Sequence, residues 1–145
     1  MTAANAARVR LADWARDRDA LRRIRHEVFV VEQQVPAELE WDGIDADCRH
    51  ALAEDAAGRP IGCGRLLPDG HIGRMAVLRD SRGQGVGAAL LARLVAEARA
   101  AGHASVVLNA QTQALAFYAR QGFVAFGDEF FEAGIAHRAM RRDLS

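Results

Sequence analysis

The spacing of apolar side chains predicts a short strand and then a long helix at the start of the chain. Apolar and polar residues alternate over 9–11, as in a half-buried strand. The next apolar positions recur at steps of three and four residues, which is typical of one helix face. They are Leu21, Ile24, Val28 and Val31. We expect Asp17 or Asp19 to cap this helix, and we expect it to end at Val35 because Pro36 restricts the residue before it.

The rest of the chain alternates between strand patterns and helix patterns. Short apolar runs bounded by turn residues predict strands. The expected strands cover 50–54, 61–67, 71–77, 106–108, 124–131 and 136–144. Two helices with apolar faces are expected between them, one ending at Gly102 and one running from a cap at Thr112 to Gly122. The resulting order is strand, helices, three strands, helix, strand, helix and two strands, which indicates a mixed α/β (α+β) sandwich.

Composition narrows the class of protein. The chain has 145 residues, half of them apolar, which suits a single domain over 1–145. Its formal net charge is zero, which argues against nucleic acid or an anionic membrane as the main partner. The first residues lack the apolar run of a signal peptide, and no stretch approaches the roughly 20 apolar residues of a membrane span. We therefore expect a cytoplasmic protein.

Cysteine and histidine usage predicts neither a disulfide scaffold nor a metal site. Cys48 and Cys63 are too few for a scaffold and lack metal-ligand spacing. They are expected to be core or near-core thiols in a reducing compartment. His26, His71 and His103 have no ligand partners at metal spacing, so no metal is assigned.

The glycines at positions 83, 85 and 87 carry the main chemical signal. They lie between a predicted strand and a predicted helix, and they remove three side chains over five residues. Backbone N–H groups can then turn toward a ligand, and the helix that follows adds its own unpaired N–H groups and the positive end of its dipole. Together these features predict an anion site, most naturally for phosphate, with Arg79 and Arg82 at its lip. The alternative is that the glycines serve only a tight turn.

Two other phosphate loops fit the sequence less well. A P-loop requires Gly-Lys-Ser/Thr, which is absent after Gly87. A dinucleotide fingerprint requires an acidic residue about 20 positions later, but residues 108–111 contain no carboxylate.

The pattern Arg82-x-x-Gly85-x-Gly87 behind the strand 74–77 resembles the pyrophosphate loop of the GNAT acetyltransferase superfamily. The resemblance implies a mostly antiparallel central sheet of six to seven strands flanked by about four helices. It also implies acetyl-CoA as cosubstrate and an amine as acceptor, in a monomer or a homodimer. The residues that it assigns to the cofactor are Met75, Ala76, Val77, Arg82, Gly83, Gln84, Gly85, Val86, Gly87 and Gln111.

In this family the strand before the loop splays away from the next central strand, and its free edge pairs with the pantetheine arm as an added strand would. The resemblance places a backbone N–H, that of Val77, near the thioester oxygen as an oxyanion donor.

The segment 117–123 resembles the second motif of the family, in which a tyrosine hydroxyl lies near the cofactor sulfur. By that resemblance Tyr118 is the acid that protonates the leaving thiolate. The alternative is that this tyrosine only packs its ring in the core. Many relatives carry a glutamate base near position 109, where this chain has Asn109, so the base stays open.

Two further segments, 25–36 and 131–140, resemble the ElaA-like branch of the family, although Ala136 stands where that branch usually has proline. His137 is a candidate catalytic base, and Glu132 a candidate for orienting a cationic amine. For each, the alternative is a structural hydrogen bond on a hairpin. The acidic stretch 38–47 either attracts the amine or is an ordinary solvated loop.

The leading hypothesis is therefore an acetyl-CoA-dependent N-acetyltransferase acting on a primary amine of a small molecule or peptide, by direct attack in a ternary complex. One alternative is an acyl-homoserine-lactone-synthase-like acyltransferase, which shares the fold but is usually longer. The other is a non-catalytic acyl-CoA-binding module, which would keep the glycine loop without needing Tyr118.

Overall fold

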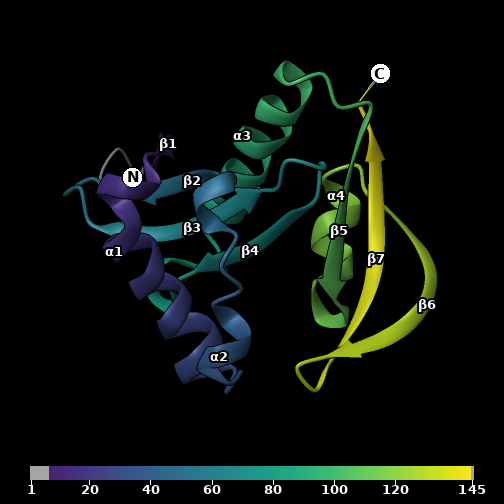
Figure 1. Ribbon diagram of the computed structural model, residues 1–145, viewed down its shortest axis with the longest axis horizontal. Helices are drawn as coiled ribbons and strands as arrows, with labels where there is room; N and C mark the ends of the chain where they lie inside the picture. The colour runs from purple at the N-terminus through teal and green to yellow at the C-terminus, as the bar shows by residue number, and fades with distance from the viewer. Residues whose placement is uncertain (1–6, 145) are drawn as a thin grey trace.

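The computed structural model describes residues 7–144, and within that range the chain forms seven strands and four α-helices (Figure 1). Their order along the chain is the order that the apolar pattern predicts. The expected α+β fold with a mostly antiparallel arrangement of strands is confirmed.

The strands form two sheets that diverge. The first is antiparallel, in the order β1 (Arg8–Ala12), β2 (Arg49–Glu54), β3 (Pro60–Leu66), β4 (Ile72–Val77). The second, also antiparallel, has the order β5 (Ser105–Gln111), β7 (Ile135–Asp143), β6 (Val124–Glu132). Between the described strands the sheets share a single parallel bridge, from His71 to Val107, beyond which β4 and β5 separate (Figure 1). The expected splay of the strand before the loop is thus confirmed.

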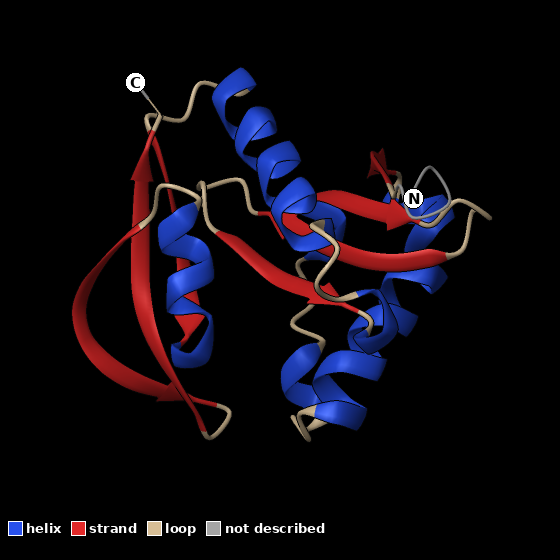
Figure 2. Cartoon of the chain, turned by 180° about the vertical axis from the view of Figure 1, so that it is seen from behind, coloured by secondary structure: helices blue, strands red, loops and turns tan. Residues whose placement is uncertain are grey.

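Two helices cover opposite faces of the first sheet. α1 (Trp14–Arg25) packs on the face that carries Leu52 and Cys63, and α3 (Val86–Ala100) packs on the face that carries Ala51 and Ile61. This division follows from strand geometry, since successive side chains point to opposite faces. Figure 2 shows α3 from behind, on the side away from α1. The shorter helices α2 (Ala37–Glu40) and α4 (Leu115–Arg120) lie on either side of the space between the sheets (Figure 1).

The long first helix departs from the expected one. Asp13, and not Asp17 or Asp19, caps it, because the Asp13 side chain accepts a hydrogen bond from the N–H of Ala15. From His26 to Glu32 the helix is a π-helix, in which the N–H of Gln33 reaches the carbonyl of Val28 five residues back.

That wider turn breaks the helical spacing after Val28. Leu21, Ile24 and Val28 are buried as expected, but Val31 is 56% exposed. The apolar face predicted from the α-helical period therefore ends one position early.

The cap expected at Thr112 is also wrong. Thr112 begins a 3₁₀ turn (Thr112–Ala114), and α4 starts after it at Leu115 with no side-chain cap. A tight turn satisfies its N–H groups internally, which removes the need for a capping hydroxyl. Within the described residues, no helix is both long and apolar enough to cross a membrane.

Candidate active site

The glycine loop between β4 and α3 has the open backbone that an anion site requires. Gly83 and Gly85 have φ angles of 76° and 81°, a left-handed conformation that favours glycine. A Cβ built at either position would meet no atom within 4 Å. α3 starts at Val86, and the first backbone hydrogen bond back to the loop is from Ala89 to the Gly85 carbonyl. The N–H groups ahead of Ala89 are therefore available at the positive end of the helix dipole.

The glycine at position 87 is explained by packing and not by backbone conformation. A Cβ there would lie 3.4 Å from Cζ of Phe117, which belongs to α4. The absence of a side chain thus lets α4 approach the first turn of α3.

Arg82 was expected to face a phosphate, and in this structure its guanidinium is held by the protein. Its two Nη atoms donate to the Glu32 carboxylate, each at 2.7 Å, and its Nε donates to the Val77 carbonyl at 2.9 Å. The hydrogen bonds from Arg82 keep the pKa of Glu32 below its usual range. Arg79 lies 3.6 Å from the same carboxylate. Glu32, which sequence reasoning missed, therefore connects the end of the π-helix to the loop.

The free edge of β4 faces the space between the sheets. The N–H of Leu78 donates to the Ile61 carbonyl on β3 at 2.9 Å. Successive N–H groups of a strand point to opposite edges, so the N–H of Val77 points away from β3, toward the side on which β5 lies. Among the described strands, none pairs with that edge of β4.

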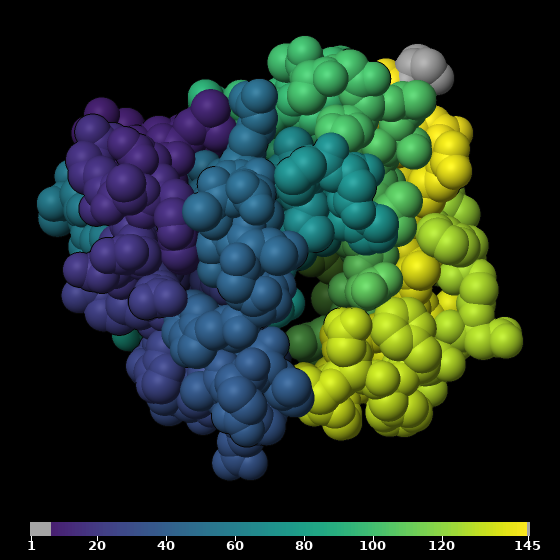
Figure 3. All heavy atoms as spheres, viewed as in Figure 1, coloured from purple at the N-terminus to yellow at the C-terminus, as the bar shows by residue number. Residues whose placement is uncertain are grey.

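A cavity of about 630 Å³ occupies this space, and its wall includes several of the predicted site residues. Those that line it are Met75, Gln111, Tyr118, Glu132 and His137. In Figure 3 it is a dark hollow between the blue segment and the yellow-green C-terminal hairpin. The side chain of Ala76 is buried in one hydrophobic cluster and that of Val77 packs, partly buried, against the other, so neither lines this cavity.

Tyr118 combines packing with access to this cavity. Its ring meets Phe117 and Phe123 edge-on, with centroids 5.0 and 6.0 Å away. Burial raises the pKa of Tyr118 to about 12, so the hydroxyl is protonated at neutral pH. Both expectations for this residue are compatible with the geometry, since the ring packs against apolar neighbours while the residue lines the cavity.

His137 lies beside Gln111, its register partner on β5. Its ring stacks on Phe130, and its Nδ1 lies 2.6 Å from the Ile135 carbonyl oxygen. A carbonyl only accepts, so Nδ1 carries the proton and Nε2 of the neutral ring is an acceptor. The structural hydrogen bond that was considered as an alternative is thus present, and it leaves the second nitrogen available for a base.

The side chain of Gln111 is hydrogen-bonded to a residue on the opposite wall of the cavity. Its Nε2 donates to Oε1 of Gln33, just after the π-helix, at 2.9 Å. This contact joins the second sheet to the wall formed by the N-terminal half of the chain. An occupant of the space between β4 and β5 must pass this bridge or break it.

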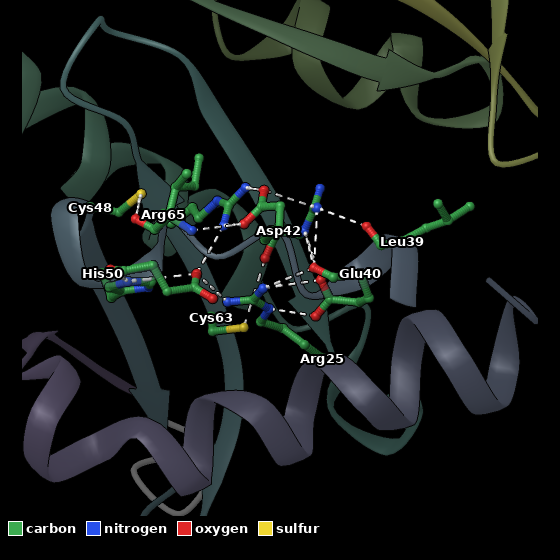
Figure 4. Close-up of polar contacts among 11 residues, drawn as sticks. Arg25, Leu39, Glu40, Asp42, Cys48, His50, Cys63 and Arg65 are labelled. Carbon is green, nitrogen blue, oxygen red and sulfur yellow. Dashed lines mark hydrogen bonds and ion pairs between the residues drawn. The ribbon is translucent and has the colours of Figure 1, made fainter. Parts of the chain in front are cut away.

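The acidic stretch is mainly structural at its buried positions, so the expectation of an ordinary solvated loop is wrong there, whereas attraction of an amine stays a prediction because Glu40 and Asp42 line the cavity. Glu40 and Asp45 are 2% and 5% exposed and bind two buried arginines, Arg25 and Arg65 (Figure 4). A buried guanidinium requires a paired carboxylate, which explains why these acids leave the solvent. Asp42 completes the network, and its hydrogen bond from Arg65 lowers the pKa of Asp42 to about 2.

The cysteines do not resemble nucleophiles. Cys63 is buried, and desolvation raises the pKa of its thiol to about 12. Cys48 is partly buried, with Sγ donating to the Ile44 carbonyl, and desolvation raises the pKa of this thiol as well. Between residues 7 and 144, no three His, Cys, Asp or Glu residues gather as metal ligands.

Comparison with known proteins places this geometry in a family. Residues 15–144 match the family model described as the acetyltransferase (GNAT) domain. An uncharacterized N-acetyltransferase of Bacillus subtilis, YjcF, is 40% identical over 124 residues, which cover 83% of this chain and 88% of that protein.

Two solved structures share the fold over nearly their whole length. An acyl-CoA N-acyltransferase from Pseudomonas aeruginosa is 35% identical, with a TM-score of 0.83 and coverage of 94% of this chain and 99% of the other. Escherichia coli ElaA is 28% identical, with a TM-score of 0.84 and the same coverage.

Proposed function

Because the chain belongs to the GNAT acetyltransferase family, we propose that it transfers an acetyl group from acetyl-CoA to a primary amine of a small molecule or peptide. Family membership makes the protein an acyl-CoA N-acyltransferase and sets aside a purely non-catalytic module. The acetyl donor, the amine acceptor and direct attack in a ternary complex are the proposal. The observation that carries it is the free edge of β4, which runs from the cavity lined by Met75 and Tyr118 to the open glycine loop at the start of α3.

The glycine loop fits the pyrophosphate of coenzyme A. The space beside Gly83 and Gly85 is open, and the N–H groups of residues 86–88 lie at the start of a 15-residue helix. The edge of β4 at 75–77 fits the amide groups of the pantetheine arm, which pair with backbone as an added strand does. When bound, acetyl-CoA supplies an acetyl group activated as a thioester.

The N–H of Val77 is the proposed oxyanion donor. It points toward the open edge, and its residue is fixed at the other end by the hydrogen bond from Arg82 to the Val77 carbonyl. A donor that is already oriented stabilises developing charge without reorganising during the reaction.

Tyr118 is the proposed acid for the leaving thiolate. With a pKa raised to about 12, the phenol is protonated throughout the range in which enzymes work and always has a hydrogen to donate. A high pKa opposes full proton transfer to a thiolate whose acid has a pKa of about 8.5 in water. The same desolvation raises the pKa of the thiol, however, which brings the two values closer.

His137 is the proposed base for the amine. The Ile135 carbonyl fixes the protonated nitrogen and leaves Nε2 as the acceptor. Glu132 also lines the cavity and adds a negative charge that favours a cationic amine before it loses its proton. Direct attack is favoured over a cysteine acyl-enzyme because the buried Cys63 thiol resists ionisation.

The test compares two glycines with the same constraint. Gly85→Glu places bulk and negative charge in the proposed phosphate site, whereas Gly102→Glu does so after the far end of α3, about 22 Å away for a helix of this length. Both glycines have positive φ and open surroundings, so the backbone strain is matched. We expect acetyl-CoA to raise the melting temperature of the parent and of Gly102→Glu, but not of Gly85→Glu.

Catalysis is then measured by release of free thiol from acetyl-CoA with a panel of primary amines, and again with hexanoyl-CoA. Equal stabilisation of both glutamate variants would remove the loop from the site. Turnover restricted to the longer acyl donor would favour the acyl-homoserine-lactone-synthase-like alternative.

A further inference from the structure

A bulge interrupts β4 just before the proposed oxyanion donor. The pairing of β3 with β4 shifts by one residue, so that Arg74 and Met75 together oppose Gly64. Because of the extra residue, the N–H and C=O groups that would otherwise face β3 after this point face the free edge, and the reverse. The bulge therefore determines that the N–H of Val77, and not that of its neighbour, faces the cleft.

The bulge holds a residue type that is disfavoured there. Arg74 has φ of 50°, in the left-handed region where a bulge commonly uses glycine. A residue whose backbone persists in a strained conformation is held there by its surroundings. The contacts of Arg74 show what holds it.

The Arg74 side chain is bound to a buried carboxylate. Its Nε donates to Oε2 of Glu40 at 2.7 Å, and its Nη2 donates to the backbone carbonyl of Glu40 at 3.2 Å. Glu40 is 2% exposed, and Arg25, which is 1% exposed, binds the same carboxylate through two nitrogens at 2.7 and 3.0 Å. The anchor of Arg74 is thus itself fixed in the interior. Arg74 is 27% exposed and lies at the edge of the network.

We propose that Arg74 is a positioning residue, whose ion pair with Glu40 fixes the left-handed bulge of β4 and so directs the Val77 N–H into the acyl-transfer cleft. This inference rests on the proposed function. It gives the network of arginines and carboxylates a role in catalysis through the backbone of β4, in addition to the place of Arg74 and Glu40 in the cavity wall. The grip on pyrophosphate is separate, because the glycine loop provides it.

The decisive variant is Arg74→Gly. Glycine adopts φ of 50° without strain, so this change keeps the bulge accessible and removes only the side chain that fixes it. Glu40 keeps its two hydrogen bonds from Arg25, so the interior stays paired. Arg74→Lys keeps the charge but loses the planar fork of donors. Arg59→Gly is the matched control, because Arg59 also loses an ion pair, with Asp55, in a turn outside the cleft.

We expect kcat of Arg74→Gly to fall about 10- to 100-fold, since a displacement of about 1 Å in a catalytic group has effects of that order. The Kd for acetyl-CoA should stay within about threefold, because a contact made only in the transition state lowers kcat and kcat/KM together. Arg74→Lys should recover part of the loss, and Arg59→Gly should match the parent. The amide ¹H and ¹⁵N shifts of Val77 should move in Arg74→Gly and not in Arg59→Gly.

A folded Arg74→Gly protein with kcat within about twofold of the parent would overturn the proposal. So would a rise in Kd that accounts for the whole loss of kcat/KM, since Arg74 would then serve binding. If Arg74→Gly does not fold, Arg74→Lys decides by the same two criteria. If the parent binds acetyl-CoA but acetylates no amine, the proposed function has failed. The Val77 shifts then decide the positioning by themselves, and unmoved shifts would overturn it.

Discussion

Replacing Gly64 with alanine tests how tightly the bulge of β4 is packed from its other side. A Cβ at Gly64 would lie 2.4 Å from Sδ of Met75 and 2.9 Å from Cδ1 of Leu94. Optimal contacts between such atoms are about 3.5 to 4 Å, so a neighbour must move by about 1 Å. Leu94 is completely buried and Met75 only partly, so Met75 moves. Overpacking of this kind costs about 1 to 3 kcal/mol, and here it also pushes Met75 into the cleft.

Urea denaturation of Gly64→Ala measures this cost, with Gly73→Ala as the control for stability. Gly73 is in β4, has no positive φ, and a Cβ there would meet nothing within 4 Å. The free energy of unfolding of the control should therefore be unchanged or higher by up to about 1 kcal/mol, because alanine lowers the conformational entropy of the unfolded chain. We also expect weaker binding of acetyl-CoA to Gly64→Ala, because Met75 lines the proposed path of the pantetheine arm. If Gly64→Ala has the stability and the acetyl-CoA affinity of the parent, the packing argument is wrong.

Three further changes test the site. Tyr118→Phe should lower kcat by about 10²- to 10⁴-fold at unchanged melting temperature, as loss of a general acid does, whereas a nearly silent substitution would restrict Tyr118 to packing. Asp42 has a folded-state pKa of about 2, below its unfolded value, so it stabilises the fold above about pH 4 and loses this contribution as the pH falls toward 2. As the pH falls, the free energy of unfolding of Asp42→Asn should therefore decrease by about 2 kcal/mol less than that of the parent. Urea titrations from about pH 6 to about pH 2.5 that show the same decrease for both proteins would contradict this. Cys63→Ala should keep turnover within about twofold, and an inactive but folded variant would instead favour an acyl-enzyme.

The parts of the fold that were predicted correctly have local causes. Gly83 and Gly85 need left-handed backbone, and their spacing before a helix is visible in the sequence without any knowledge of the partner elements. The strands were found because alternation and short apolar runs survive in the linear pattern. The position of Tyr118 in the cavity wall followed from a motif, which carries a spatial relation that periodicity does not contain.

The parts that were missed depend on partners distant in the chain. Arg25 and Arg65 are buried only because carboxylates 15 and 20 residues away neutralise them. Without knowledge of its partner, an arginine on a helix is expected to be exposed to solvent, and so is an acidic residue in a polar stretch. The apolar spacing also did not reveal the π-helix at residues 26–32, whose last residue, Glu32, pairs with Arg82 fifty positions later.

Two arginines act on β4, Arg74 from within the strand and Arg82 from the loop that follows it. Arg82 binds the carbonyl of Val77 from the glycine loop, and Arg74 is tied to Glu40 at the bulge. Each is anchored by a glutamate from the segment that follows α1, namely Glu32 and Glu40. The geometry of the free edge therefore depends on the N-terminal segment as well as on the sheet. A perturbation of residues 26–40 should accordingly change acyl transfer even where it leaves the glycine loop intact, which distinguishes this arrangement from a cleft shaped by β4 and β5 alone.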